Sequence, residues 1–167
     1  MRAPLFILVV LCLSKVSLAQ KDARSLEPPH RAALATYLNA HKNCDFLPES
    51  VFEDKFGRGE IAFVKKNLGS HFQRPFYIVA DFNADKRNDF AMLLGATISG
   101  RRQYRIIVWN GTKRGYRVAW QDAQTQLGMF SLSWEKKGKQ RLVFGPPESD
   151  AGFLLTPAGS SYIPEGG

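Results

Sequence analysis

The stretch Val79-Ala80-Asp81-Phe82-Asn83-Ala84-Asp85-Lys86-Arg87-Asn88-Asp89-Phe90-Ala91 carries the strongest pattern in this chain. Apolar runs at 76–80 and 90–94 flank it, and their aromatic and β-branched residues predict two strands. Between them, oxygen-bearing side chains occupy loop positions 1, 3, 5 and 9, namely Asp81, Asn83, Asp85 and Asp89. On a tightly curled backbone, alternate residues point into one concavity, which suits a hard cation such as calcium. We therefore expect a strand–loop–strand unit with a calcium-type loop.

An EF-hand does not fit this loop, because Met92 occupies position 12 and the flanking runs predict strands instead of helices. The pattern resembles the calcium loop of FG-GAP and VCBS repeat proteins, apolar–Asp-x-Asn-x-Asp-Gly-x-x-Asp–apolar. The resemblance implies a structural calcium ion with four side-chain ligands and one backbone carbonyl ligand. Those residues are Asp81, Asn83, Asp85 and Asp89 for the side chains and Arg87 for the carbonyl. Lys86 stands where the family has glycine, and the pattern occurs once, so a propeller of such repeats is not expected.

The same residues also suit a turn without metal. Asp and Asn side chains commonly accept hydrogen bonds from nearby backbone N–H groups and so stabilise tight turns. Lys86 and Arg87 place two positive charges beside the carboxylates. The sequence leaves both interpretations open, a metal-binding loop and a polar turn.

The first residues have the features of a secretory signal. Arg2 precedes an apolar run from Leu5 to Leu13, and small residues at Ser17 and Ala19 fit cleavage after Ala19. The apolar run is too short to span a bilayer. We expect an exported protein, periplasmic or secreted, without a membrane span. Its mature part would retain one cysteine, Cys44, which excludes a disulfide within that chain.

The remaining pattern predicts one α+β domain. We expect residues 1–19 as signal, 20–29 as a flexible lead, 30–163 as the domain and 164–167 as a tail. Helical spacing predicts a helix over about 29–40 and a second helical region over 51–68, interrupted by Gly57 and Gly59, with a short strand at 60–64 as the alternative. After Pro75 the runs at 76–80, 90–94, 104–109, 116–120, 129–134 and 142–144 predict strands. Helices followed by strands predict N-terminal helices packed on an antiparallel β meander.

Basic residues cluster along two of these predicted strands. Asn110-Gly111 between them is a hairpin signal. A hairpin would bring Arg105, Lys113, Arg114 and Arg117 onto one positive, aromatic surface, where they would bind an anionic polymer or an acidic protein. Because export is expected, nucleic acid is not the expected target. The competing interpretation is ordinary solubilising charge on exposed strands.

Two sets of residues are catalytic candidates. His41 and Cys44 lie three residues apart and could act as base and nucleophile. The acids Glu49, Glu53, Asp54 and Glu60 lie on a predicted helical surface. We favour a non-enzymatic binding domain containing a calcium loop. The alternatives are a secreted inhibitor-like protein whose loop is a turn without metal, or a hydrolase.

Overall fold

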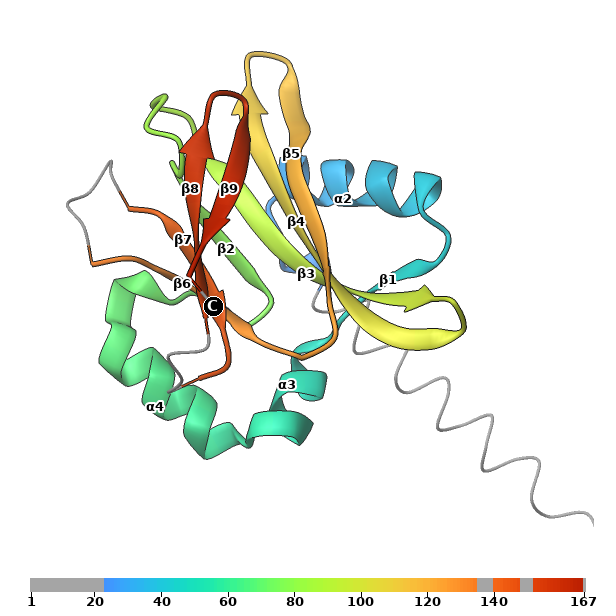
Figure 1. The fold of residues 1–167 in the computed structure, drawn as a ribbon, viewed down its shortest axis with the longest axis vertical. Helices are drawn as coiled ribbons and strands as arrows, with labels where there is room; N and C mark the ends of the chain where they lie inside the picture. The colour runs from blue at the N-terminus through green and yellow to red at the C-terminus, as the bar shows by residue number, and fades with distance from the viewer. Residues whose placement is uncertain (1–22, 135–139, 148–151, 167) are drawn as a thin grey trace, which may run out of the picture.

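The computed structural model describes residues 23–134, 140–147 and 152–166, which form helices and two antiparallel sheets (Figure 1). The mixed α+β class expected from the sequence is confirmed. The predicted signal and the first residues of the predicted lead lie outside the described residues. Among the helices that are described, none is long and apolar enough to cross a membrane.

Proline and glycine mark most of the helix boundaries. Helix α2 spans Pro28–Ala40 with proline in its first turn, where a missing N–H costs nothing. Helices α3 (Glu49–Phe56) and α4 (Arg58–Leu68) are separated by Gly57, whose φ of +84° interrupts the helix. Gly69, with a φ of +52°, ends α4, and the short 3-10 helix η1 (Gly69–His71) follows. The segment 60–64 is therefore helical, and the strand alternative is wrong.

The first sheet is built around β3 (Asp89–Ile98), which is buried from Asp89 to Ala96. Strand β4 (Arg101–Thr112) pairs along one side of β3 and is followed by β5 (Gly115–Gln124). On the other side of β3, two short strands pair one after the other. These are β2 (Tyr77–Ala80) beside the start of β3 and β1 (Cys44–Phe46) beside its later part. Strand β1 is not among the strands predicted from the sequence.

The second sheet has the order β6-β7-β8-β9. Its strands are β6 (Met129–Leu132), β7 (Leu142–Gly145), β8 (Phe153–Ala158) and β9 (Ser161–Glu165). Strand β9 runs into the segment expected to be a tail, because it pairs with β8 and buries Tyr162. The strands therefore divide into two sheets.

The first sheet lies between α2 and the second sheet (Figure 1). On one face, Phe90 and Trp109 pack against rings of α2. On the other face, Trp120 contacts Phe153 of β8. The pairing of β4 with β5 shifts by one residue between Val108 and Trp109, because β5 contains one extra residue there. Strict alternation along 116–120 would place Tyr116, Val118 and Trp120 on one face, but an extra residue in β5 turns Trp120 to the opposite side.

Candidate functional site

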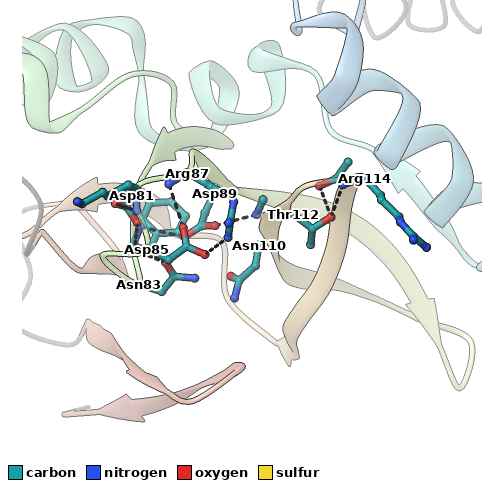
Figure 2. A network of polar contacts seen from close by, with 12 residues as sticks. Asp81, Asn83, Asp85, Arg87, Asp89, Asn110, Thr112 and Arg114 are labelled. Atoms are coloured by element: carbon teal, nitrogen blue, oxygen red, sulfur yellow. Dashed lines mark hydrogen bonds and ion pairs between the residues drawn. The ribbon is translucent and has the colours of Figure 1, made fainter.

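The loop from Asp81 to Asp89 is closed by its own side chains (Figure 2). The Asp81 carboxylate accepts hydrogen bonds from the backbone N–H groups of Asp85 (3.0 Å) and Lys86 (2.8 Å). Asn83 Oδ1 also accepts from the Asp85 N–H, at 3.0 Å. The curl requires positive φ at two residues other than glycine, Ala84 (+59°) and Lys86 (+68°). Lys86 thus adopts the left-handed conformation for which the FG-GAP and VCBS pattern uses glycine, at a cost of about 1 kcal/mol.

Asp85 is paired with Arg87 inside the same loop. One carboxylate oxygen accepts the Arg87 backbone N–H at 2.9 Å, and the other lies 3.1 Å from the Arg87 guanidinium. Both side chains are partly exposed, so this pair adds little to stability. It does neutralise part of the negative charge of the loop.

Asp89 differs from the other acids because it is fully buried. Its two oxygens accept the backbone N–H of Phe82 (3.0 Å) and of Gly111 in β4 (2.9 Å). Burial raises the pKa of the Asp89 carboxyl to about 6, although these two hydrogen bonds oppose the rise, and the nearby charges of Asp85 and Asp81 raise it further. Asp89 therefore joins the loop to the sheet.

The Gly111 N–H donates to this carboxylate, and Asn110 and Gly111 lie in strand β4 and not in the hairpin turn. A side chain at Gly111 would collide with the carbonyl oxygen of Asn88, so glycine allows the acidic loop to approach β4. The Asn110 amide oxygen is buried and accepts the hydroxyl of Tyr162 at 2.7 Å. The turn lies two residues later, at Thr112–Gly115, where Thr112 Oγ1 donates to the Gly115 carbonyl. The predicted hairpin is confirmed, but its turn is formed by Lys113 and Arg114 and not by Asn110-Gly111, because Gly111 lies against the backbone of the acidic loop.

The five predicted calcium ligands thus separate into an exposed and a buried part. Asp81, Asn83, Asp85 and Arg87 lie in the exposed curl of the loop, whereas Asp89 points toward the core. In the part of the chain that the structure describes, no three or more His, Cys, Asp or Glu side chains form a group that could hold a metal ion. A carboxylate oxygen that accepts an N–H retains a further lone pair, so calcium at the exposed curl stays a prediction.

The predicted basic surface is divided between the two ends of the β4–β5 hairpin. Arg105 pairs with Ala123, whereas Lys113 and Arg114 form the turn at the opposite end. Lys113 comes eight positions after Arg105, just beyond the end of β4, which corresponds to about 26 Å of extended chain. Arg105 is half-buried, and its hydrogen bond with Tyr37 raises the pKa of the guanidinium. The expectation of one joint surface is therefore wrong, and the binding role of these residues stays a prediction.

The turn end of the hairpin remains strongly basic. Lys113, Arg114 and Arg117 are exposed, and none forms an ion pair with a described acid. Arg102 at the other end, by contrast, is bound to Asp45 through both terminal guanidinium nitrogens, Nη1 and Nη2. Figure 2 shows Arg114 extending from the turn, away from the acidic loop. We call Lys113, Arg114 and Arg117 the basic tip.

The proposed base and nucleophile are occupied by structural contacts. His41 stacks on Tyr37 at 3.9 Å, and its Nδ1 lies 2.9 Å from the Tyr37 carbonyl oxygen. Cys44 is buried, and burial raises the pKa of its thiol, whereas a nucleophilic cysteine needs a lowered pKa. Among the predicted helical acids, Glu53 is paired with Arg58 at 3.0 Å. These contacts do not favour hydrolysis.

One polar centre was not expected from the sequence. His30 of α2 is fully buried, with Nδ1 2.5 Å from the Tyr77 hydroxyl and Nε2 2.6 Å from the Tyr116 hydroxyl. Burial lowers the pKa of His30, which Glu27 partly opposes. A neutral imidazole donates through one nitrogen and accepts through the other, so it satisfies both tyrosines. No sequence signal links His30 to Tyr77, 47 positions later, or to Tyr116, 86 positions later.

Comparison of this chain with protein-family models, with curated proteins and with solved structures gave no match. The FG-GAP and VCBS resemblance of the loop therefore stays a prediction from the Asp81–Asp89 pattern.

Proposed function

We propose that this protein is an exported, non-catalytic binding protein that holds an anionic polymer at the basic tip. The observation that carries the proposal is three exposed cations at one end of the β4–β5 hairpin, without acidic partners among the described residues. Lys113 and Arg114 form the turn, and Arg117 follows it in β5. Uncompensated charge of one sign attracts an oppositely charged polymer over several ångströms. The net charge of the whole sequence is +8 at pH 7, and removal of Arg2 and Lys15 with the predicted signal would leave +6, which acts in the same direction.

The neighbouring acidic loop does not cancel this attraction. Its exposed charges are Asp81 and Asp85 against Lys86 and Arg87, which balance formally, while Asp89 is buried beneath them. A polymer approaching the tip therefore meets three positive charges beside a nearly neutral loop. Arginine adds flat, multiple hydrogen-bond donors that suit sulfate, phosphate and carboxylate groups.

A heparin column tests this proposal, with heparin serving as the probe polyanion. We expect the double variant Lys113→Glu, Arg117→Glu to elute at lower salt than the wild type. The matched control is Lys65→Glu, Lys66→Glu at the exposed end of α4, which changes the net charge equally. Equal losses in both double variants would show that net charge alone acts and would reject the basic tip.

The proposal includes a structural calcium ion bound by the acidic loop. The support is the compact curl that brings oxygens of Asp81, Asn83 and Asp85 into one turn around shared backbone N–H groups. A cation bound only by the folded loop would stabilise the fold by mass action. We expect a higher melting temperature in calcium than in chelator, and a smaller difference in Asp81→Ala. An unchanged melting temperature in the two solutions would remove calcium from the proposal.

Export rests on the predicted signal. Expression with the full leader, followed by cell fractionation and N-terminal sequencing, should yield an exported chain beginning at Gln20. A cytoplasmic chain that retains Arg2 would contradict this part of the proposal.

A further inference from the structure

A groove runs between α2 and the β4–β5 hairpin, next to the basic tip. Its volume is about 480 Å³, within the range of small-molecule sites. Small side chains of α2 form one wall, including Ala32, Ala33 and Thr36. Trp109 and Val118 belong to the opposite wall. Val118 pairs with Trp109, which places both residues on the α2 side of the sheet.

The aromatic walls of the groove are held by contacts behind them. The Tyr116 hydroxyl is bound to His30, and the Tyr37 hydroxyl donates to Gln121 at 2.7 Å. Trp109 stacks on Phe90 at 4.5 Å with an angle of 8° between the rings. Because the hydroxyls of both tyrosines are occupied, these residues offer a ligand mainly ring surface. The walls are therefore apolar and ordered before a ligand arrives.

The charge at the groove has one sign. Arg114 lines it, is exposed, and forms no ion pair with any described acid. Among the residues that the structure describes, no aspartate or glutamate lines the groove. An apolar groove with a single guanidinium matches a ligand with an apolar body and one anionic end, since guanidinium binds carboxylate through two parallel hydrogen bonds.

We propose that this groove binds a small amphipathic carboxylate, with the apolar chain between α2 and β5 and the carboxylate at Arg114. The site shares Arg114 with the basic tip but does not require polymer binding. The apolar chain of the ligand covers ring faces and alanine methyl groups, and the Arg114 guanidinium selects for negative charge.

Calorimetric titration of the full protein with decanoate, with neutral decanamide and with acetate tests the proposal. We expect decanoate to bind about tenfold more tightly than decanamide, because the charged hydrogen bond adds to the same apolar contact. Acetate should not bind measurably. Equal affinities for decanoate and decanamide would overturn the role of Arg114.

Different substitutions test the contributions of the apolar wall and of the Arg114 charge to binding. Arg114→Met should lower decanoate affinity to the level of decanamide, whereas Lys113→Met, the neighbouring control, should leave it unchanged. Ala32→Phe and Thr36→Phe, both at exposed helix positions, should each remove binding of both ligands by filling the groove. Wild-type affinity in both filled variants, with melting temperatures preserved, would overturn the proposal.

Heparin elution of the same variants shows whether ligand binding in the groove and polymer binding at the basic tip are independent. Ala32→Phe should elute at the wild-type salt concentration, because the groove is filled while the basic tip is intact. Loss of decanoate binding with normal heparin elution would support the groove independently. Normal decanoate binding in Lys113→Glu, Arg117→Glu would show that the groove works without the polymer site.

Discussion

Replacing Asp89 by asparagine tests whether the buried carboxylate joins the acidic loop to the sheet. The side chain keeps its size, but only one of its two terminal atoms can still accept a hydrogen bond. The amide NH₂ would then face either the Phe82 N–H or the Gly111 N–H, both now bonded to the carboxylate. A buried donor left without an acceptor costs about 1–3 kcal/mol, so we expect Asp89→Asn to lower the free energy of unfolding by about 2 kcal/mol.

The matched control is Asp81→Asn. Asp81 also accepts two backbone N–H groups, but it is partly exposed, and water can replace a lost acceptor. We expect a loss below about 1 kcal/mol. Urea unfolding followed by circular dichroism measures both variants. A loss in Asp89→Asn no larger than in Asp81→Asn would refute the reasoning.

The pH dependence of the Asp89→Asn difference provides a second test. The folded pKa of Asp89, about 6, lies above its ordinary value of 3.8, so the folded state binds the proton more tightly than the unfolded state. This stabilisation is complete below the ordinary value and disappears as pH rises through 6. The gap between wild type and Asp89→Asn should therefore widen by up to about 3 kcal/mol from pH 8 to pH 4.

The wild type must be compared with Asp89→Asn because His30 changes the free energy of unfolding with pH in the opposite direction. Burial lowers the pKa of His30, so its contribution is present above its ordinary pKa and is lost as pH falls. Since both proteins contain His30, its effect cancels in the comparison. A gap that is constant from pH 8 to pH 4 would contradict the raised pKa of Asp89.

Three further changes test the same structure by chemical unfolding. Lys86→Gly should raise the free energy of unfolding by about 0.5 kcal/mol, because glycine adopts the positive φ without strain. The control Lys66→Gly, inside α4, should lower it by about 1 kcal/mol. A lower free energy of unfolding in Lys86→Gly would contradict backbone strain at this position. Gly111→Ala should cost about 2 kcal/mol, because its methyl group collides with the loop backbone, and a neutral result would mean the loop moves aside freely. His30→Ala should cost about 3 kcal/mol by leaving a buried tyrosine hydroxyl without its partner, against less than about 1 kcal/mol for His41→Ala, and similar losses at both would be inconsistent with the buried network.

Local patterns predicted the elements whose cause is local. The alternation of oxygen-bearing residues between apolar runs identified the loop and its two strands, because turn residues and strand residues differ in their backbone preferences. Helix α2 followed from its apolar spacing, and the break at Gly57 followed from glycine in a helical pattern. The strand β1 was missed because Cys44–Phe46 is held by pairing with β3, some fifty residues later in the chain, and not by its own composition.

The Asn110-Gly111 prediction shows why a local signal can mislead. Glycine is required both by tight turns and by close backbone approach, and the sequence does not distinguish the two. In this protein Gly111 lies against the carbonyl of Asn88, so the turn moves to Lys113 and Arg114. The same shift places Arg105 far from the basic tip, which no count of basic residues could indicate.

The sequence alone determined the mixed α+β class, the position of the acidic loop and the presence of a basic hairpin, since each depends on residues close together in the chain. Tertiary structure alone decided what the loop residues do. It turned Asp89 into the core, left Asp81 and Asp85 at the surface, and placed Arg114 beside the groove under α2. The physical reason is that burial and hydrogen-bond partners depend on which distant segments pack together. A carboxylate, an arginine or a histidine has no fixed role until that packing sets its surroundings.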